Sequence, residues 1–135
     1  MNEYIRMCSQ ANEIQDIWQP QRLDKYYLED NNGDIYNKSI EDTLKNEDYM
    51  IEENGVWIPR QEDYQKIISN YQRVEKKIED WTPWVLIQRL YMYMDEPQIK
   101  WNSNIDLNQI YLELTMETVY NKKWDSKKGT WIFIE

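Results

Sequence analysis

Histidine is absent from this chain of 135 residues. Histidine is the side chain that most often acts as a general base near neutral pH, so Ser–His and Cys–His nucleophile pairs are excluded. A zinc site is disfavoured as well, because such sites are built mainly from cysteine and histidine and Cys8 is the only cysteine. We therefore expect a protein without enzymatic activity, with no cofactor, no metal and no catalytic residue.

Glycine, cysteine and long apolar runs are also scarce. The three glycines, Gly33, Gly55 and Gly129, lie far apart, so the chain has no glycine-rich phosphate-binding loop. A single cysteine cannot form an intramolecular disulfide, which fits a reducing cytosol. No stretch approaches the roughly 18 apolar residues of a membrane span, and the N-terminus lacks the apolar core of a signal peptide. We expect a cytoplasmic protein that does not bind membranes.

Basic residues are outnumbered, with 16 Lys and Arg against 25 Asp and Glu, and the net charge is −9. This balance disfavours direct binding to nucleic acid, whose phosphates favour a basic surface. The excess is concentrated in residues 41–63, where eight acids stand against Lys45 and Arg60, a net of −6. This segment is either a solvated surface or a surface that attracts a protein partner with a basic groove.

Aromatic residues are abundant: the chain has seven Trp and eleven Tyr. Disordered chains are poor in such residues, so their number indicates a folded core despite a mean hydropathy of −0.95. The length is that of one ordinary domain, and we expect residues 1–135 to form a single compact domain.

Apolar residues at steps of three and four predict helices over 3–18, from Glu62 to Ile78, over 84–94 and over 106–123. Cys8 lies on the apolar side of the first helix and is expected to be buried. Asp80 or Thr82 can cap the third helix, with Pro83 in its first turn. That helix is apolar on nearly all sides, so we expect it either in the middle of the fold or against a partner, including a second copy in a homodimer.

Short strands are predicted between these helices. Two runs bearing tyrosine flank Asn-Asn-Gly-Asp within 25–39 and indicate a hairpin. Residues 49–52 and 56–58 are a second candidate, and a third hairpin is expected to join Trp124 to Trp131. The acidic turn 30–34 alternates oxygen-bearing side chains, as calcium-binding loops do, but its glycine comes two places early for an EF-hand loop. A plain turn is therefore favoured over a calcium site.

Taken together, these elements predict an α+β fold class, with about four helices and short antiparallel hairpins.

The stretch GVWIPRQEDYQKII, residues 55–68, combines a strand with the start of a helix. Val56–Ile58 are strand-like, and Pro59 ends the ladder. Glu62 and Asp63 then suit the first turn of a helix, where the helix dipole favours acids. A strand-to-helix corner explains the stretch. The functional alternative is a contact site at Trp57 and Arg60.

Parts of the chain resemble a family of small uncharacterised proteins from bacteriophages and prophages of Gram-positive bacteria. The matching stretches are YIRMCSQANEIQDIWQP (4–20), VWIPRQEDYQKII (56–68) and LNQIYLELTMETVYNKKWDSKKGTWI (107–132). The shared elements are a W-[IL]-P-R-Q corner and a closing helix with a tryptophan hairpin. Residues 21–55 and 69–106 diverge, and the hairpin turn is longer than in the family. The resemblance implies expression inside a bacterial cell and brings no activity with it.

The favoured function is that of a non-enzymatic interaction protein that inhibits a host factor, for example a nuclease of a defence system. The acidic segment could imitate the charge of nucleic acid, while tryptophans anchor the contact, since interfaces are enriched in them. The core is the other place for those tryptophans: it is favoured for Trp57, whereas both places stay open for Trp101. The candidate binding residues are Trp57, Arg60, Trp101, Glu47, Asp48, Glu52 and Glu53.

Two other functions stay open. The chain could bind a small ligand such as a nucleotide signal, because aromatic rings stack on bases. The phosphates of such a ligand would need cations, and the candidates are Arg60, Arg73, Arg89 and Lys100. The chain could also be an enzyme that uses carboxylates alone, although 25 acids make accidental pairs inevitable and no residue stands out.

Overall fold

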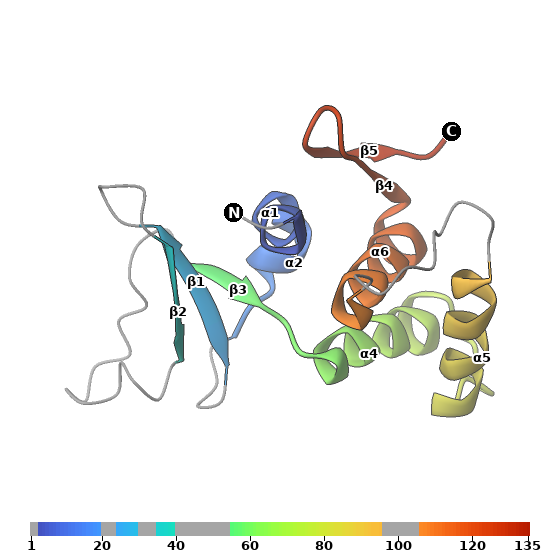
Figure 1. Cartoon of the computed structure of the whole chain (residues 1–135). Coiled ribbons are helices and arrows are strands. Elements are labelled where there is room, and N and C mark those ends of the chain that lie inside the picture. Colours follow the sequence, from blue (N-terminus) through green and yellow to red (C-terminus); the bar gives the residue numbers. More distant parts are fainter. Residues whose placement is uncertain (1–2, 20–23, 30–34, 40–54, 96–105) are drawn as a thin grey trace. The chain divides into compact units, whose positions relative to one another are not determined.

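The structure is a computed structural model that describes residues 3–19, 24–29, 35–39, 55–95 and 106–135 (Figure 1). The fold class is α+β, as predicted, with helices α1, α2, α4, α5 and α6 and short antiparallel strands. The contacts of the chain divide it into two units, described separately below. Unit 1 comprises Met1–Pro59 and Asp125–Trp131, and unit 2 comprises Arg60–Trp124 and Ile132–Glu135. The single domain over 1–135 stays a prediction.

Unit 1 begins with two short helices, α1 (Glu3–Gln10) and α2 (Asn12–Asp16). The sequence predicts one helix here, and the difference lies at Ala11, whose backbone is not helical (φ −85°, ψ 69°). The Ala11 carbonyl oxygen accepts the first bonds of α2, at 3.0 Å from the amides of both Ile14 and Gln15. The predicted apolar stripe is nevertheless buried, and Cys8 is a buried free thiol, as expected.

Three strands form the sheet of unit 1 in the order β2-β1-β3 (Figure 1). Strands β1 (Lys25–Glu29) and β2 (Ile35–Ser39) pair antiparallel, which confirms the predicted hairpin. Strand β3 (Val56–Ile58) pairs antiparallel with β1, with Tyr26 opposite Trp57. The partner predicted for β3, residues 49–52, and the acidic turn 30–34 lie outside the described residues. Within the unit, α1 packs against β3.

The tip of the C-terminal hairpin also belongs to unit 1. The hairpin consists of β4 (Lys122–Asp125) and β5 (Thr130–Phe133), as predicted. Asp125 organises the turn: its carboxylate accepts from the amides of Lys127 and Lys128, and its carbonyl oxygen accepts from Gly129 at 2.8 Å. Gly129 has φ +67°, a region that side chains disfavour. The Trp131 indole N–H donates to the Met7 carbonyl oxygen at 3.0 Å, which ties the tip to α1.

Unit 2 begins with α4 (Gln61–Asn70), and its start confirms the helical side of the predicted corner. The Arg60 amide donates to the Asp63 carboxylate at 2.8 Å, and the Asp63 amide donates to the Arg60 carbonyl oxygen at 2.9 Å. These two bonds satisfy backbone groups that the first turn of a helix leaves without partners.

A π-helix, η2 (Tyr71–Glu75), continues α4. The Lys76 amide donates to the Tyr71 carbonyl oxygen at 3.0 Å, five residues back, which is the bond that defines this wider turn. The continuous helix therefore ends at Glu75, three residues before the predicted end at Ile78, and its last turn is a π-turn. Lys77 follows with φ 54°, which reverses the chain towards the next helix.

The helix α5 (Pro83–Met94) starts at the predicted cap, where the Thr82 hydroxyl accepts from the Val85 amide at 3.4 Å. The helix α6 (Leu107–Tyr120) starts at Asp106, whose carboxylate accepts from Asn108, and it ends at Asn121 in the left-handed region. The three helices α4, α5 and α6 pack on one another. The most buried is α6, through Ile110, Tyr111, Leu112, Leu114, Thr115 and Met116.

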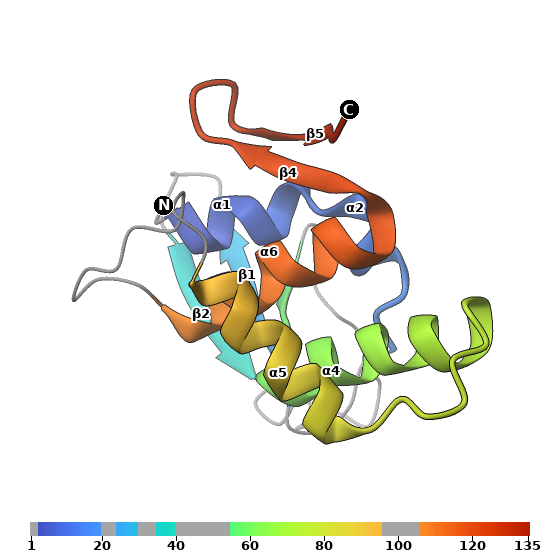
Figure 2. The ribbon, with the colours of Figure 1, turned by 90° about the vertical axis from the view of Figure 1, so that its right-hand side faces the viewer.

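The most apolar helix in sequence is therefore not the central one. In Figures 1 and 2, α5 is the outermost of the three helices of unit 2. In the described part of the chain, no helix is long and apolar enough to cross a membrane.

Candidate functional site

Of the predicted binding residues, the structure describes only Trp57 and Arg60. Trp101 and the acids Glu47, Asp48, Glu52 and Glu53 lie outside the described residues, so their role stays a prediction. Trp57 belongs to unit 1 and Arg60 to unit 2, and each is taken within its own unit.

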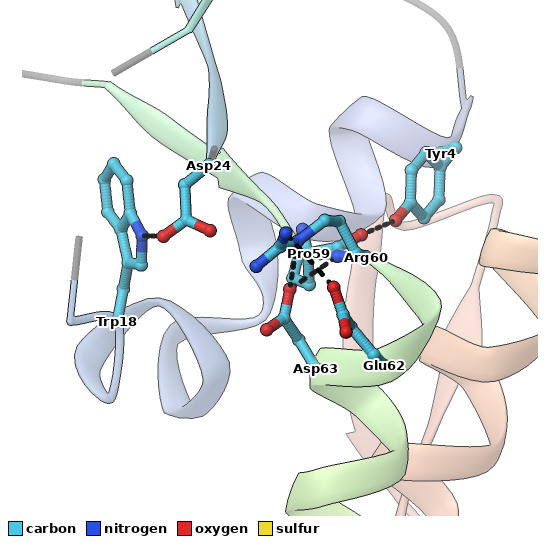
Figure 3. Close-up of polar contacts among 7 residues, drawn as sticks. All are labelled: Tyr4, Trp18, Asp24, Pro59, Arg60, Glu62 and Asp63. Carbon is cyan, nitrogen blue, oxygen red and sulfur yellow. Dashed lines mark hydrogen bonds and ion pairs between the residues drawn. The ribbon is translucent and has the colours of Figure 1, made fainter. Parts of the chain in front are cut away.

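Trp57 lies in the interior of unit 1, with 6% of its surface exposed. Its ring stacks on Trp18, with centroids 5.9 Å apart and planes 6° apart. The Trp18 indole N–H in turn donates to the buried carboxylate of Asp24 at 2.9 Å (Figure 3), and the Trp18 ring meets Tyr26 at 6.1 Å. The core position that the sequence favours for Trp57 is the one observed, in place of an exposed contact site.

The backbone of Trp57 is held by a side chain of α2. The Gln15 amide accepts from the Trp57 N–H at 2.8 Å and donates to the Trp57 carbonyl oxygen at 3.0 Å. The same amide nitrogen lies 3.2 Å from the Cys8 carbonyl oxygen. Among the described strands, β3 is the outer one of the sheet, and Gln15 supplies at Trp57 the kind of bonds that another strand would supply.

Arg60 is engaged by the acids of the first turn of α4. Its guanidinium lies 3.1 Å from the Glu62 carboxylate and 3.5 Å from the Asp63 carboxylate (Figure 3). The positive charge of Arg60 is thus balanced by two carboxylates of the first helical turn, as is common at the N-terminus of a helix. About a third of its side chain, 35%, is exposed and can be reached from solvent.

The other cations proposed for phosphate binding are engaged in unit 2. Arg73 donates from Nε and Nη2 to the Trp81 carbonyl oxygen, at 3.3 and 3.2 Å. Arg89 lies over the Trp81 ring, 5.8 Å from its centroid. Lys100 lies outside the described residues. These contacts fix the corner before α5 and do not by themselves favour a phosphate site.

One side of α5 carries Trp84, Ile87 and Tyr91, with Met92 at its border, and is the most exposed apolar surface that the structure describes. These side chains are 66%, 51%, 75% and 69% exposed, respectively. Trp84, Ile87 and Tyr91 follow one another at steps of three and four, so they lie along one side of the helix. Leu86 and Leu90, four residues apart, form a second stripe, and this one is buried in unit 2. We call the exposed stripe the aromatic face of α5.

The aromatic face is also free of acids, although the chain is strongly acidic. Residues 83–94 contain no Asp or Glu, and Arg89 is their single charged residue. Its guanidinium is directed to the Trp81 ring. Grouped apolar surface of this kind marks contact sites for other molecules in folded proteins.

Hydrogen bonds of Trp81 connect the residues before α5 to the rest of unit 2. Trp81 is buried, and its indole N–H donates to the Ser69 hydroxyl of α4 at 3.1 Å. With the two bonds from Arg73, this places the start of α5 against α4. The aromatic face is therefore held on a fixed helix, which lowers the entropic cost of binding.

The sequence predicts the helix 84–94 and offers Arg89 within it as a phosphate contact, but none of its apolar residues is among the predicted binding residues. The missed signal is the presence of two apolar stripes, one through Leu86 and Leu90 and one through Trp84, Ile87 and Tyr91. One helix cannot bury both stripes against the same neighbour.

Among the described residues, no group of three or more Cys, Asp or Glu side chains could hold a metal ion. No protein-family model, curated protein or solved structure matches this chain.

Proposed function

We propose that this chain is an acidic interaction protein without enzymatic activity, which acts by binding other protein chains. The observation that supports this proposal is the aromatic face of α5, where four large apolar side chains are each more than half exposed. Tryptophan and tyrosine are the residues that most often dominate the binding energy of protein interfaces. Burial of such a face against another chain removes apolar surface from water, which is the main favourable term in association.

The target that we propose is a basic protein of a bacterial host, such as a component of a defence system. The resemblance to bacteriophage and prophage proteins supports the setting, which is the cytoplasm of the bacterial host. The net charge of −9 supports the choice of a basic partner, because it attracts positive surfaces and speeds encounter with them. The acids Glu47, Asp48, Glu52 and Glu53 are the proposed electrostatic contacts, with Trp101 as a further anchor.

Capture from a lysate of a Gram-positive bacterium tests the proposal. The tagged chain is compared with a variant that carries Trp84→Ser and Tyr91→Ser. The matched control is Phe133→Ser, which removes another aromatic side chain that is 69% exposed. We expect the chain and the control to retain the same protein, identified by mass spectrometry, and the double variant to retain at least tenfold less.

Two further variants address the acidic segment. One replaces Glu47, Asp48, Glu52 and Glu53 with their amides, and the other carries Trp101→Ala. Loss of capture with the amide variant would support the electrostatic contact. Capture that is the same for all variants would contradict both the role of α5 and the role of the acids.

A further inference from the structure

The pattern along the aromatic face of α5 reads similarly in both directions. Trp84 lies three residues before Ile87, and Tyr91 lies three residues after Gln88. Trp84 and Tyr91 thus lie at equal distances from the midpoint between Ile87 and Gln88. An antiparallel pairing about a two-fold axis at this midpoint would bring Trp84 of one copy to Tyr91 of the other, and the reverse.

We propose that α5 pairs antiparallel with α5 of a second copy, about a two-fold axis that passes between Ile87 and Gln88. This inference rests on the proposed function, in which the aromatic face binds protein, and it names the occupant of that face. Trp84 of each copy then meets Tyr91 of the other, an aromatic pair that contributes beyond its buried area. Ile87 of each copy lies beside the axis, next to its own symmetry mate and to Gln88.

The charge of this face permits a second copy. Residues 83–94 contain no acids, so the attraction of a basic partner comes from acids elsewhere in the chain and not from this face. Two copies with a net charge of −9 each repel one another, so they can meet only where acids are absent. Asp80 and Asp95 are exposed beyond the two ends of the helix and would lie at the rim of the contact.

The area of the face suits a weak dimer. An aromatic side chain carries about 150–250 Å² of surface, and most of this is exposed at Trp84 and Tyr91. With Ile87 and Met92, the two copies together would bury on the order of 1,000 Å², which is at the low end for specific complexes. The dimer is therefore expected to form at high micromolar concentration and to dissociate on dilution.

Sedimentation equilibrium over about a hundredfold range of concentration tests the pairing. Two single variants, Ile87→Glu and Ile87→Lys, place like charges beside the axis when each is studied alone. An equimolar mixture of the two places opposite charges there. We expect a concentration-dependent dimer for the unaltered chain, monomers for each variant alone, and a dimer again for the mixture. Far-ultraviolet circular dichroism checks that the exposed substitutions leave the helices unchanged.

Other outcomes overturn the pairing. A monomer at every concentration overturns it, and so does a dimer that Ile87→Glu leaves intact. An unaltered chain that is monomeric, yet loses its captured protein when Trp84 and Tyr91 are replaced, would overturn the second copy while leaving the proposed function standing. A dimer that behaves as expected, with no captured protein from the host, would support the pairing and contradict the host target.

Discussion

Gln15 forms bonds with both backbone groups of Trp57 and also reaches the carbonyl oxygen of Cys8. One amide therefore connects α1, α2 and β3 within unit 1. Each of these bonds needs a specific end of the amide: the oxygen accepts from Trp57, and the nitrogen donates to the two carbonyl oxygens. A side chain of the same size that cannot donate would lose two of the three bonds.

We predict that Gln15→Glu lowers the free energy of unfolding by about 1–3 kcal/mol, because the new carboxylate faces two carbonyl oxygens without a proton to donate. Urea denaturation at neutral pH measures the change. Gln19→Glu is the matched control, since Gln19 is exposed and its substitution adds the same charge. Equal stability of the two variants would show that the loss of the Gln15 hydrogen-bond donor costs nothing beyond the effect of the added negative charge.

The residues of the candidate site could be predicted only in part. The sequence points to Trp57 and Arg60 because they lie close to Pro59, at a corner between a strand and a helix. Trp57 contacts Trp18 and Gln15 in the interior of unit 1. Arg60 pairs with Glu62 and Asp63 in the first turn of α4. The partners of Arg60 are close in sequence and could be foreseen. Those of Trp57 lie about 40 residues away, where local patterns carry no information.

Among the elements, the helix α5 depends on the corner that precedes it. Trp81 is buried at this corner, with its indole N–H on Ser69 and its carbonyl oxygen on Arg73. The corner follows a π-helix and a residue with positive φ, Lys77, so its path is not that of a simple helix connection. The bonds to Trp81 therefore set where α5 begins and support the face that we propose to bind.

We predict that Ser69→Ala lowers the free energy of unfolding by about 1–3 kcal/mol, because it leaves the buried indole N–H of Trp81 without its acceptor. The same substitution in a Trp81→Phe background should have almost no effect, since no N–H is then left unpaired. Thermal or urea denaturation of the four proteins measures this coupling. If Ser69→Ala lowers the free energy of unfolding equally in both backgrounds, the effect does not come from the hydrogen bond between Trp81 and Ser69.

Elements with a strong local signal were predicted well. The hairpins at 25–39 and at the C-terminus, the cap at Thr82 and the helix after Asp106 all follow from turn, cap and spacing signals. The break at Ala11 and the π-helix were not predicted, because alanine favours helices and the apolar residues from Tyr64 to Ile78 keep an ordinary helical spacing in the sequence. In the wider π-turn, Gln72 is buried and Val74 is 67% exposed, which the spacing does not predict. The exposure of α5 is a third case, since α6 occupies the centre of unit 2 instead.

At the scale of the whole molecule, charge and apolar surface are distributed differently along the chain. Acids are concentrated in residues 41–63, whereas the aromatic face of α5 has none. The two proposed contacts therefore differ in their physical basis. The contact with a basic host protein adds electrostatic attraction to the apolar contact of the aromatic face, whereas the contact between two copies is apolar alone and is opposed by the net charge.

Salt should consequently strengthen the binding of two copies and weaken the binding of the host protein. We predict that raising NaCl from about 0.05 to about 0.5 M tightens the dimer several-fold and weakens capture of the host protein, because screening reduces repulsion in the first and attraction in the second. Sedimentation equilibrium and quantitative capture at each salt concentration measure the two effects. The mixture of Ile87→Glu and Ile87→Lys provides a matched control, since its added attraction across the axis should be reduced by the same salt. A dimer of the unaltered chain that dissociates as salt rises would mean that opposite charges, and not the aromatic face of α5, hold the two copies together.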